Sequence, residues 1–316
     1  MTRPKIAIIG LGRLGASMGL ALKKAKVEAT VVGHDKDTNV AQRAAKRGAV
    51  DKAEWNLINA CEGAGLIILA LPLSGIVPTL TAISKYLEPG QIITDTAPTK
   101  KPVLEAAKLL PASAQFIGGD PIITSARMRY DAVGVDASDA ELFDDALYCL
   151  TPADNATEGA IQTVSSFVAL LGAKPFFLDA YEHDALVTGV RHLALALSAA
   201  LMKTASASGS WRDLSRMAGA DFYRATELLQ GEASTHAETL LAHREALVHW
   251  INSTVGALEQ IRAQIEQNDA QGLESMFQDL LRARSDWKEG QVGKEPATSY
   301  EDIRVNPMRL FLGGLA

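Results

Sequence analysis

Cysteine is scarce in this sequence, which contains only two in 316 residues. Cys61 and Cys149 form no CxxC motif, so neither a disulfide framework nor a thiolate metal site is expected. We predict two reduced, packed thiols. His236 and His243 lie seven residues apart and lack the i, i+4 spacing of helical metal ligands. We therefore interpret them as solvated or core histidines and predict no metal site.

Long hydrophobic runs are also lacking. The longest apolar stretches, such as residues 65–73, are too short to span a bilayer, so we expect no membrane segment. The sequence enters a strand-like run within five residues of its start, which leaves no room for a secretory signal. We therefore expect a cytoplasmic protein.

Two further absences narrow the function. The net charge is -6 and there is no long basic run, which argues against nucleic acid as the main partner. No G-x-S-x-G motif occurs, so acyl-transfer chemistry has no support. A small-molecule substrate is the expected partner.

Short β-branched runs alternate with segments of helical spacing in the first half of the chain. This alternation is typical of a parallel sheet covered by helices on both faces. The expected strands begin near residues 5, 29, 66, 91, 114, 147 and 174. They predict the α/β class, with a doubly wound Rossmann domain over residues 1–178.

Helical periodicity replaces the strand pattern after about residue 180. The expected helices cover residues 181–207, 210–230, 235–267 and 269–289, so residues 179–288 are predicted to form an all-helical second domain. Residues 289–316 are polar and rich in turn residues before an apolar end. We interpret them as a C-terminal arm, either a frayed terminus or a strap across a partner subunit, and prefer the strap.

Three glycines, Gly10, Gly12 and Gly15, follow the first expected strand and open a helix. This G-x-G-x-x-G spacing lets a tight turn approach a pyrophosphate that lies at the helix N-terminus. Asp35 lies 20 residues beyond Gly15, at the place where a carboxylate binds the adenosine ribose hydroxyls. The context predicts a dinucleotide site and favours NAD.

Other residues complete the predicted cofactor-binding set. Arg13 and Lys36 could bind a 2′-phosphate, which leaves NADP open. Leu14 lies in the first helical turn, and Thr96 follows the run at 91. Leu71 and Pro72 follow the run at 66, where Pro72 is explained equally well as a plain strand terminator.

The order and spacing of several segments resemble the prephenate dehydrogenase family. These segments are IIGLGRLGASMGLAL, VVGHDKD, LIILALPLS, QIITDTAPTKKPVLEAA, FIGGDPI, LYCLTP and EHDALVTGVRHLALALSAAL. The resemblance implies an NAD(P)-dependent enzyme of tyrosine biosynthesis that oxidatively decarboxylates prephenate or arogenate. It also implies a Rossmann domain followed by a helical domain that forms a homodimer, with the substrate in the cleft between the domains.

Four motifs depart from that family's pattern. Pro98 stands where the family has a serine, and Asp120 replaces the catalytic histidine of the family's HP-x-x-G motif. In the family's S-H-L-P-H motif, Arg191 replaces the serine and Leu195 the second histidine. Glu227 stands where the resemblance places the arginine that binds the substrate carboxylate. The sequence therefore predicts the fold more firmly than the substrate.

Oxidation of a ring alcohol needs a proton acceptor, and a carboxylate substrate needs a cation. Asp120 could accept the proton if a cleft raises its pKa, although we prefer to interpret it as an exposed turn aspartate before Pro121. His192 is a second acceptor, or a histidine packed between helices.

Two arginines and two acidic residues complete the candidates. Arg191 and Arg224 could each bind a carboxylate, or be ordinary surface arginines. Glu182 and Asp184, which flank His183, are explained as acidic residues at a helix start.

Three hypotheses follow. The first is a prephenate or arogenate dehydrogenase with a rebuilt site. The second is a dehydrogenase or reductase of the same fold that acts on another small hydroxy acid, carbonyl or imine. The third is a dinucleotide-binding protein without turnover.

Overall fold

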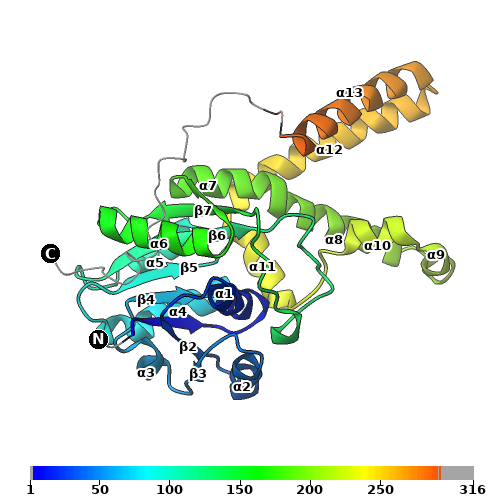
Figure 1. Ribbon diagram of the computed structural model, residues 1–316. Coiled ribbons are helices and arrows are strands. Elements are labelled where there is room, and N and C mark those ends of the chain that lie inside the picture. Colours follow the sequence, from blue (N-terminus) through cyan, green and yellow to red (C-terminus); the bar gives the residue numbers. More distant parts are fainter. Residues whose placement is uncertain (1–2, 291, 293–316) are drawn as a thin grey trace. The chain divides into compact units, whose positions relative to one another are not determined.

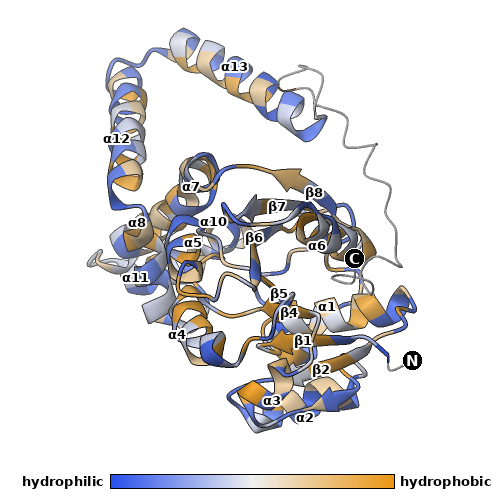
Figure 2. Ribbon diagram, turned by 90° about the vertical axis from the view of Figure 1, so that its left-hand side faces the viewer, coloured by the Kyte–Doolittle hydropathy of each residue, from blue (hydrophilic) through white to orange (hydrophobic). Residues whose placement is uncertain are grey.

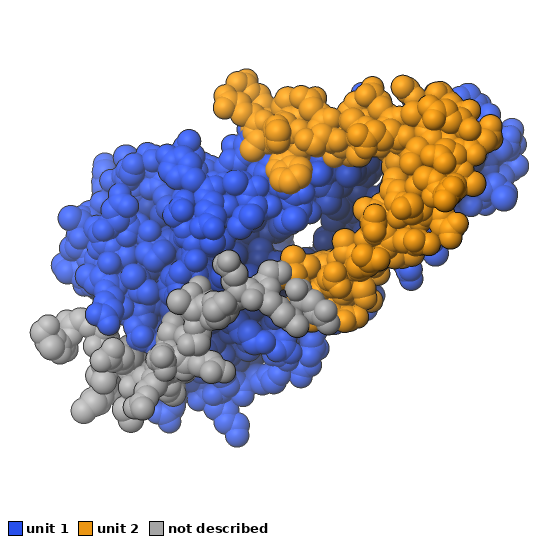
Figure 3. Space-filling model, turned by 90° about the horizontal axis from the view of Figure 1, so that it is seen from above, with its two compact units in different colours: residues 1–243, 305–316 blue, residues 244–304 orange. Residues whose placement is uncertain are grey.

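The computed structural model describes residues 3–290 and 292. Within this part the chain divides into two compact units, residues 3–243 and residues from 244 onward (Figure 3). The larger unit contains the whole sheet and the first eleven helices that Figure 1 labels. The smaller one contains the last two.

An eight-stranded sheet with the order β3-β2-β1-β4-β5-β6-β7-β8 forms the centre of the larger unit. Its strands are β1 (Lys5–Ile9), β2 (Thr30–His34), β3 (Lys52–Ala53), β4 (Leu66–Leu69), β5 (Ile92–Asp95), β6 (Gln115–Ile122), β7 (Leu147–Pro152) and β8 (Lys174–Phe177). The chain crosses over between β3 and β4, as the doubly wound arrangement requires. The predicted Rossmann fold is confirmed.

The prediction of a wholly parallel sheet is wrong at one edge. Strands β1 to β6 are parallel, but β7 pairs with β6 in antiparallel register, with Asp120 opposite Cys149. Strand β8 then pairs with β7 in parallel. Residues 148–151 of β7 are all buried, so the apolar pattern of this strand does not reveal the reversal.

Helices cover both faces of the sheet because alternate strand residues are buried on opposite sides. In β1, Ile6 and Ile8 belong to one core cluster and Ala7 and Ile9 to the other. The covering helices are α1 (Arg13–Lys24), α2 (Thr38–Lys46), α3 (Leu57–Cys61), α4 (Leu73–Ile83), α5 (Lys101–Ala107) and α6 (Glu158–Leu170). Figure 2 shows the strongly apolar strands between them.

Short 3-10 turns occur at Ser84–Tyr86 and at Val135–Ala137. Cys61 and Cys149 are both buried and unpaired, as predicted.

The remaining helices match the expected segments 181–207 and 269–289 closely, but they break the other two. They are α7 (Ala180–Val187), a π-helical segment (Thr188–His192), α8 (Leu193–Ser206), α9 (Trp211–Met217), α10 (Ala220–Thr226), α11 (Ala233–Ala242), α12 (Arg244–Glu266) and α13 (Ala270–Lys288). The expected helix 210–230 breaks at Ala218, which is extended, and the expected helix 235–267 breaks at His243. The predicted arm 289–316 lies almost entirely outside the described residues.

Residues Ala180–Ser206 form one continuous helical stretch that is long and apolar enough to cross a membrane, judged by length and composition alone. The expectation that every apolar stretch is too short to span a bilayer is therefore wrong by this measure, whereas the expectation of no membrane segment stays a prediction. This stretch contains His183 and Asp184, whose buried side chains bond to β6 and to the start of α5. Polar bonds of this kind are typical of a helix packed inside a folded unit.

Candidate active site

The glycine turn after β1 has the geometry of a dinucleotide cradle. Gly10 adopts φ +91, and a Cβ on Gly10 would collide with the carbonyl of Ala70, so only glycine fits there. A Cβ on Gly15 would collide with the carbonyl of Gly10, whereas one on Gly12 would meet open space. No side chain caps the N-terminus of α1. Its first N–H groups are thus free for a pyrophosphate.

Asp35 is fixed directly beyond β2. Its carboxylate accepts hydrogen bonds from the backbone N–H groups of Leu11 (2.8 Å) and Asp37 (2.9 Å). The carboxylate therefore lies beside the glycine turn, as the ribose-binding prediction requires. Lys36 is exposed next to it.

The other predicted cofactor residues follow neighbouring strands. Leu14 lies in the first turn of α1, Leu71 and Pro72 follow β4, and Thr96 follows β5. Because β1, β2, β4 and β5 are parallel neighbours, these residues lie at one edge of the sheet. Pro72 also occupies the N-cap position of α4, so its role as a strand terminator is compatible with this location.

Arg13 has a partner that the sequence did not indicate. Its guanidinium donates hydrogen bonds to the carbonyls of Arg127 (3.2 Å), Ala132 (3.1 Å) and Arg129. These carbonyls belong to the connection between β6 and β7. Arg13 therefore holds a loop in this structure.

Asp120 is not an exposed turn residue, and our preferred interpretation of it was wrong. It lies in β6 and is 1% exposed. The pairing of β6 with β5 ends at Ile117, so Asp120 lies beyond the carboxyl end of β5. Arg191 Nη1 donates to both of its oxygens, at 3.0 and 2.7 Å.

The charge environment of Asp120 is the reverse of what a general base needs. Burial alone would raise its pKa, but Arg191 and the hydrogen bond from His183 outweigh burial and lower it. The same ion pair raises the pKa of Arg191. Arg191 and His183 therefore favour the charged form of Asp120, which acts as an anchor for both.

His183 is the residue of the site that sequence reasoning missed. Its Nε2 lies 3.2 Å from Asp120 Oδ2 and its Nδ1 lies 2.8 Å from Asp184 Oδ1. Carboxylate oxygens only accept, so both ring nitrogens donate and the imidazole is positively charged. Burial opposes this charge, but the two carboxylates outweigh burial and raise the pKa of His183. The signal was the EHD triplet at 182–184, which we had explained as a helix start.

Asp184 serves a different helix from its own. Asp179 caps α7, whereas Asp184 accepts the backbone N–H groups of Lys100 (2.7 Å) and Lys101 (2.9 Å) at the start of α5. Burial would raise its pKa, but His183 and these N–H groups lower it. Our interpretation of Asp184 as a helix-start residue of its own helix was therefore wrong. Glu182 is exposed in the first turn of α7.

His192 and His243 form a second layer of the cluster. Their rings stack in parallel with centroids 5.9 Å apart, and His243 Nε2 lies 3.2 Å from Asp184 Oδ2. His192 is 1% exposed, and neither of its ring nitrogens has a hydrogen-bond partner among the described residues. Burial, helped by His243 and Arg191, lowers the pKa of His192 to about 4. His192 is therefore a buried, neutral imidazole whose two ring nitrogens lack a partner among the described residues.

Lys100 and Asp95 form a fully buried ion pair beside this cluster. Lys100 Nζ donates to Asp95 Oδ2 and to the carbonyl of Gly119, both at 2.6 Å. The Lys100 side chain passes β6 at Gly118. A side chain at position 118 would crowd Lys100 Cδ. The ion pair joins the end of β5 to β6 and so fixes the backbone of β6 next to Asp120.

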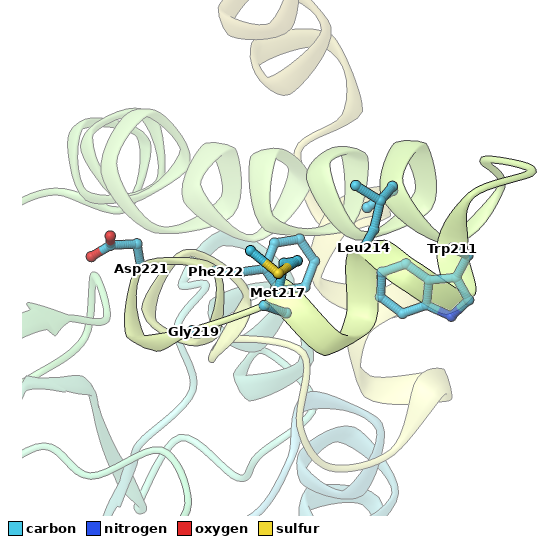
Figure 4. A pocket seen from close by; sticks show the side chains of 8 residues that line it. Trp211, Leu214, Met217, Gly219, Asp221 and Phe222 are labelled. Atoms are coloured by element: carbon cyan, nitrogen blue, oxygen red, sulfur yellow. The ribbon is translucent and has the colours of Figure 1, made fainter.

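Arg224 is not brought into the cluster. It is exposed on α10, and no hydrogen bond or ion pair joins it to another described residue. Asp221 and Phe222 of the same helix line a cavity of about 430 Å³ with Trp211, Leu214 and Met217, as Figure 4 shows. That cavity shares no residue with the cluster around Asp120.

The positions that depart from the family pattern also have places in this structure. Pro98 is half-buried after β5, and Leu195 is buried on α8 three residues beyond His192. Glu227 is half-buried at the C-terminal end of α10. Among the departing positions, Asp120 bonds to His183 and Arg191 bonds to Asp120.

Comparison with known proteins places the chain in a family. Residues 18–176 match the family model of the prephenate dehydrogenase nucleotide-binding domain, and residues 179–279 match that of the prephenate dehydrogenase dimerization domain. Prephenate dehydrogenase of Lactococcus lactis subsp. cremoris is 32% identical over 297 residues, covering 89% of this chain and 76% of the relative. That of Bacillus subtilis is 26% identical over 311 residues, covering 96% and 81%.

Solved structures of two dehydrogenases have a similar fold. Synechocystis arogenate dehydrogenase has a TM-score of 0.72 and 26% identity, covering 90% of this chain and 99% of that one. Aquifex aeolicus prephenate dehydrogenase, solved with hydroxyphenyl propionate and NAD+, shares the fold with a TM-score of 0.81 at 20% identity, covering 90% and 99%. The predicted resemblance and α/β fold are thereby confirmed, and the family model of a nucleotide-binding domain supports the predicted dinucleotide site. The chain belongs to the prephenate dehydrogenase family of NAD-dependent oxidoreductases.

Proposed function

We propose that this chain oxidatively decarboxylates prephenate or arogenate with NAD, in tyrosine biosynthesis. The observation that carries the proposal is the juxtaposition of the partly exposed Arg191 and the buried His192 at the cofactor edge of the sheet. A guanidinium and a neutral imidazole are the two groups that oxidation of a cyclic hydroxy acid requires. NAD, when bound, supplies the hydride acceptor.

Each residue then has a distinct task. Arg191 uses only Nη1 for Asp120, and its side chain is 41% exposed, so its other nitrogens can bind a substrate carboxylate. That carboxylate adds negative charge beside His192 and raises its pKa towards neutrality. His192 accepts the proton of the ring hydroxyl. Asp120 and His183 orient Arg191.

The cofactor preference follows from Asp35 and Arg13. The Asp35 carboxylate, held beside the glycine turn, repels a 2′-phosphate. The guanidinium of Arg13, which could have bound that phosphate, is bonded to the β6–β7 connection instead. We therefore propose NAD as the working cofactor.

The reaction is tested by following reduced cofactor with prephenate or arogenate and with NAD or NADP. We expect reduction with NAD, and a loss of about 100-fold or more in kcat for His192→Ala, with His236→Ala as the matched control. If the wild type binds NAD but oxidises neither compound, the proposed reaction is wrong. A panel of other hydroxy acids, carbonyls and imines then separates the two remaining hypotheses, a different substrate and binding without turnover.

We also propose that the chain works as a cytoplasmic homodimer. The family model that matches residues 179–279 describes a dimerization domain. Apolar side chains are exposed along α12 in this structure, including Val248, Val255 and Leu258. A second copy of the chain would cover such a surface.

A further inference from the structure

A short connection, residues 96–100, joins β5 to α5. It begins with Thr96, which we predict to belong to the cofactor site. Thr96, Ala97, Thr99 and Lys100 are all buried. Backbone groups that are buried in this way need hydrogen-bond partners within the protein. The partners of this connection therefore show which parts of the site it is tied to.

Two side chains, Asp95 and Lys100, tie the connection to β6. Asp95 accepts the backbone N–H groups of Ala97 (2.8 Å) and Gly119 (3.0 Å). Lys100 Nζ donates to Asp95 Oδ2 and to the carbonyl of Gly119, both at 2.6 Å. The backbone pairing of β5 with β6 has already ended at this level. The two side chains therefore hold β6 in place of that pairing, directly before Asp120.

The other end of the connection is tied to α7 by Asp184. Lys100 is the N-cap residue of α5 and makes no capping bond with its own side chain. Asp184 instead accepts the backbone N–H groups of Lys100 (2.7 Å) and Lys101 (2.9 Å), which lack acceptors within their own helix. A second contact between the two helices, Lys101 Nζ 4.9 Å from the centre of the Tyr181 ring, lies at the surface, where Tyr181 is 69% exposed.

These bonds close into a ring that starts and ends at Lys100. Asp184 Oδ1 lies 2.8 Å from His183 Nδ1, and His183 Nε2 lies 3.2 Å from Asp120 Oδ2. Asp120 directly follows Gly119, whose carbonyl accepts the bond from Lys100 Nζ. All members of the ring are buried. Bonds in such surroundings are strong and an unpaired member is costly, so displacement of one member affects the others.

Arg191 is attached to this ring from the substrate side. Its Nη1 donates to both oxygens of Asp120, at 3.0 and 2.7 Å, and its side chain is 41% exposed. Thr96 lies on the cofactor side, four residues before Lys100 and directly after β5. The ring thus lies between the arginine that we assign to the substrate and a segment that we assign to the cofactor.

We propose that Asp184 is a positioning residue that couples residues 96–100 to Arg191, so that NAD and the substrate each strengthen the binding of the other. A cofactor bound at Thr96 immobilises the connection, and a carboxylate bound to Arg191 immobilises Asp120. Both ligands immobilise the same ring, so the ligand that binds second loses less conformational entropy. By linkage the effect is equal in both directions. This inference rests on the proposed function for the identity of the substrate.

Hydrogen exchange tests the link between Arg191 and α5 without any ligand. Arg191→Ala removes a cation that fixes Asp120, and Asp120 is joined through His183 to Asp184. We therefore expect the backbone amides of residues 100 and 101 to exchange about fivefold faster in Arg191→Ala than in the wild type.

The amides of Ile58 and Asn59 provide the internal control, because Asn56 caps α3 through the same kind of side-chain bond. Their exchange should change by less than about twofold. Unchanged exchange at residues 100 and 101 would overturn the proposal, and so would an equal change at the control amides.

Binding measurements test the coupling itself. NADH, which cannot accept a hydride, is the probe, and its fluorescence is titrated with and without saturating prephenate or arogenate. We expect the wild type to bind NADH about fivefold more tightly when the substrate is present. In Asp184→Asn this ratio should lie within about twofold of one, because the amide has one acceptor oxygen and no charge to hold His183. Tyr181→Leu is the matched control, since it removes the exposed contact between the same two helices and should retain the wild-type ratio.

Calorimetric titration shows first whether prephenate or arogenate binds. A wild-type ratio of one for a compound that binds would overturn the proposal, and so would a folded Asp184→Asn that keeps the wild-type ratio. If Asp184→Asn does not fold, hydrogen exchange in Arg191→Ala decides, because the replaced side chain is partly exposed. If neither compound binds, the proposed function fails, and hydrogen exchange alone decides whether the ring links Arg191 to residues 96–100.

Discussion

Asp120 retains a negative charge inside the protein because two cations surround it. An isolated buried carboxylate would become protonated, but Arg191 donates to both oxygens and the imidazolium of His183 to one. His183 in turn is charged because Asp184 faces its other nitrogen. Each charge in this series of ion pairs depends on its neighbour, so removal of one charged group affects the others.

We expect Asp120→Asn to lower the free energy of unfolding by about 2–3 kcal/mol, because it leaves the buried His183 facing a neutral amide. The loss falls below that of a fully buried pair, since Arg191 is 41% exposed. Urea denaturation at neutral pH measures it. Asp136→Asn, which removes an exposed partner of Arg43, should change the midpoint little. Equal midpoints for Asp120→Asn and the wild type would contradict this account.

Acid should destabilise the protein through His192. Its pKa falls from 6.5 to about 4 on folding, so the unfolded chain binds more protons between these values and stability declines as the pH falls. The contribution is on the order of 3 kcal/mol at most. His192→Leu has no proton to bind and should show a shallower decline. Denaturation at several pH values between 4 and 6.5 measures the slope.

The exposed His249 provides the control for that experiment, because His249→Leu should retain the wild-type slope. His183 acts in the opposite direction. Its raised pKa stabilises the fold below its unfolded value of 6.5, and that stability is lost as the pH rises through the folded pKa. If His192→Leu loses stability in acid as steeply as the wild type, His192 is not the source of the acid destabilisation.

At the scale of elements, local patterns predicted the cofactor side well. The turn at Gly10–Gly15 and Asp35 lie where spacing alone places them, because strand, turn and helix are continuous in the chain. The two-residue β3 is too short to show a period, and no period reveals that β7 is reversed. The buried cluster depends on contacts such as Asp120 with His183, 63 residues apart, which no local signal encodes.

A π-helical segment explains part of that difficulty. Residues Thr188–His192 depart from the α-helical period between α7 and α8. Such segments often occur at functional sites, because they redirect the side chains that follow them. Here Arg191 and His192 both lie in the segment, so α-helical spacing misplaces the two residues that we assign to the substrate.

The glycine turn predicts different outcomes for two neighbouring substitutions. Gly12→Ala meets open space, so folding stability should change little while the Kd for NAD rises about tenfold or more. Gly15→Ala forces α1 away from the turn and should lower the free energy of unfolding by about 1–3 kcal/mol. Calorimetric titration with NAD and urea denaturation measure the two effects. Equal stability losses in both variants would contradict the cradle geometry.

At the scale of the whole molecule, α12 has more apolar surface than a solvated helix needs. Val248, Ile251, Val255 and Leu258 are 36% to 57% exposed and follow one another at intervals of three or four residues. This spacing places them on one face of the helix. A continuous apolar stripe is typical of a helix that packs against another chain.

The stripe predicts how the dimer should break. Replacing Val255 and Leu258 together with aspartate puts two charges into the expected interface and should weaken association about 100-fold or more, leaving a monomer at micromolar concentration. Light scattering after size-exclusion chromatography measures the mass. Gln260→Asp, two residues from Leu258 and off the stripe, adds a charge to the same helix and should leave the dimer intact. A double variant that stays dimeric would place the interface on another surface, since these two side chains could not be buried there as charges.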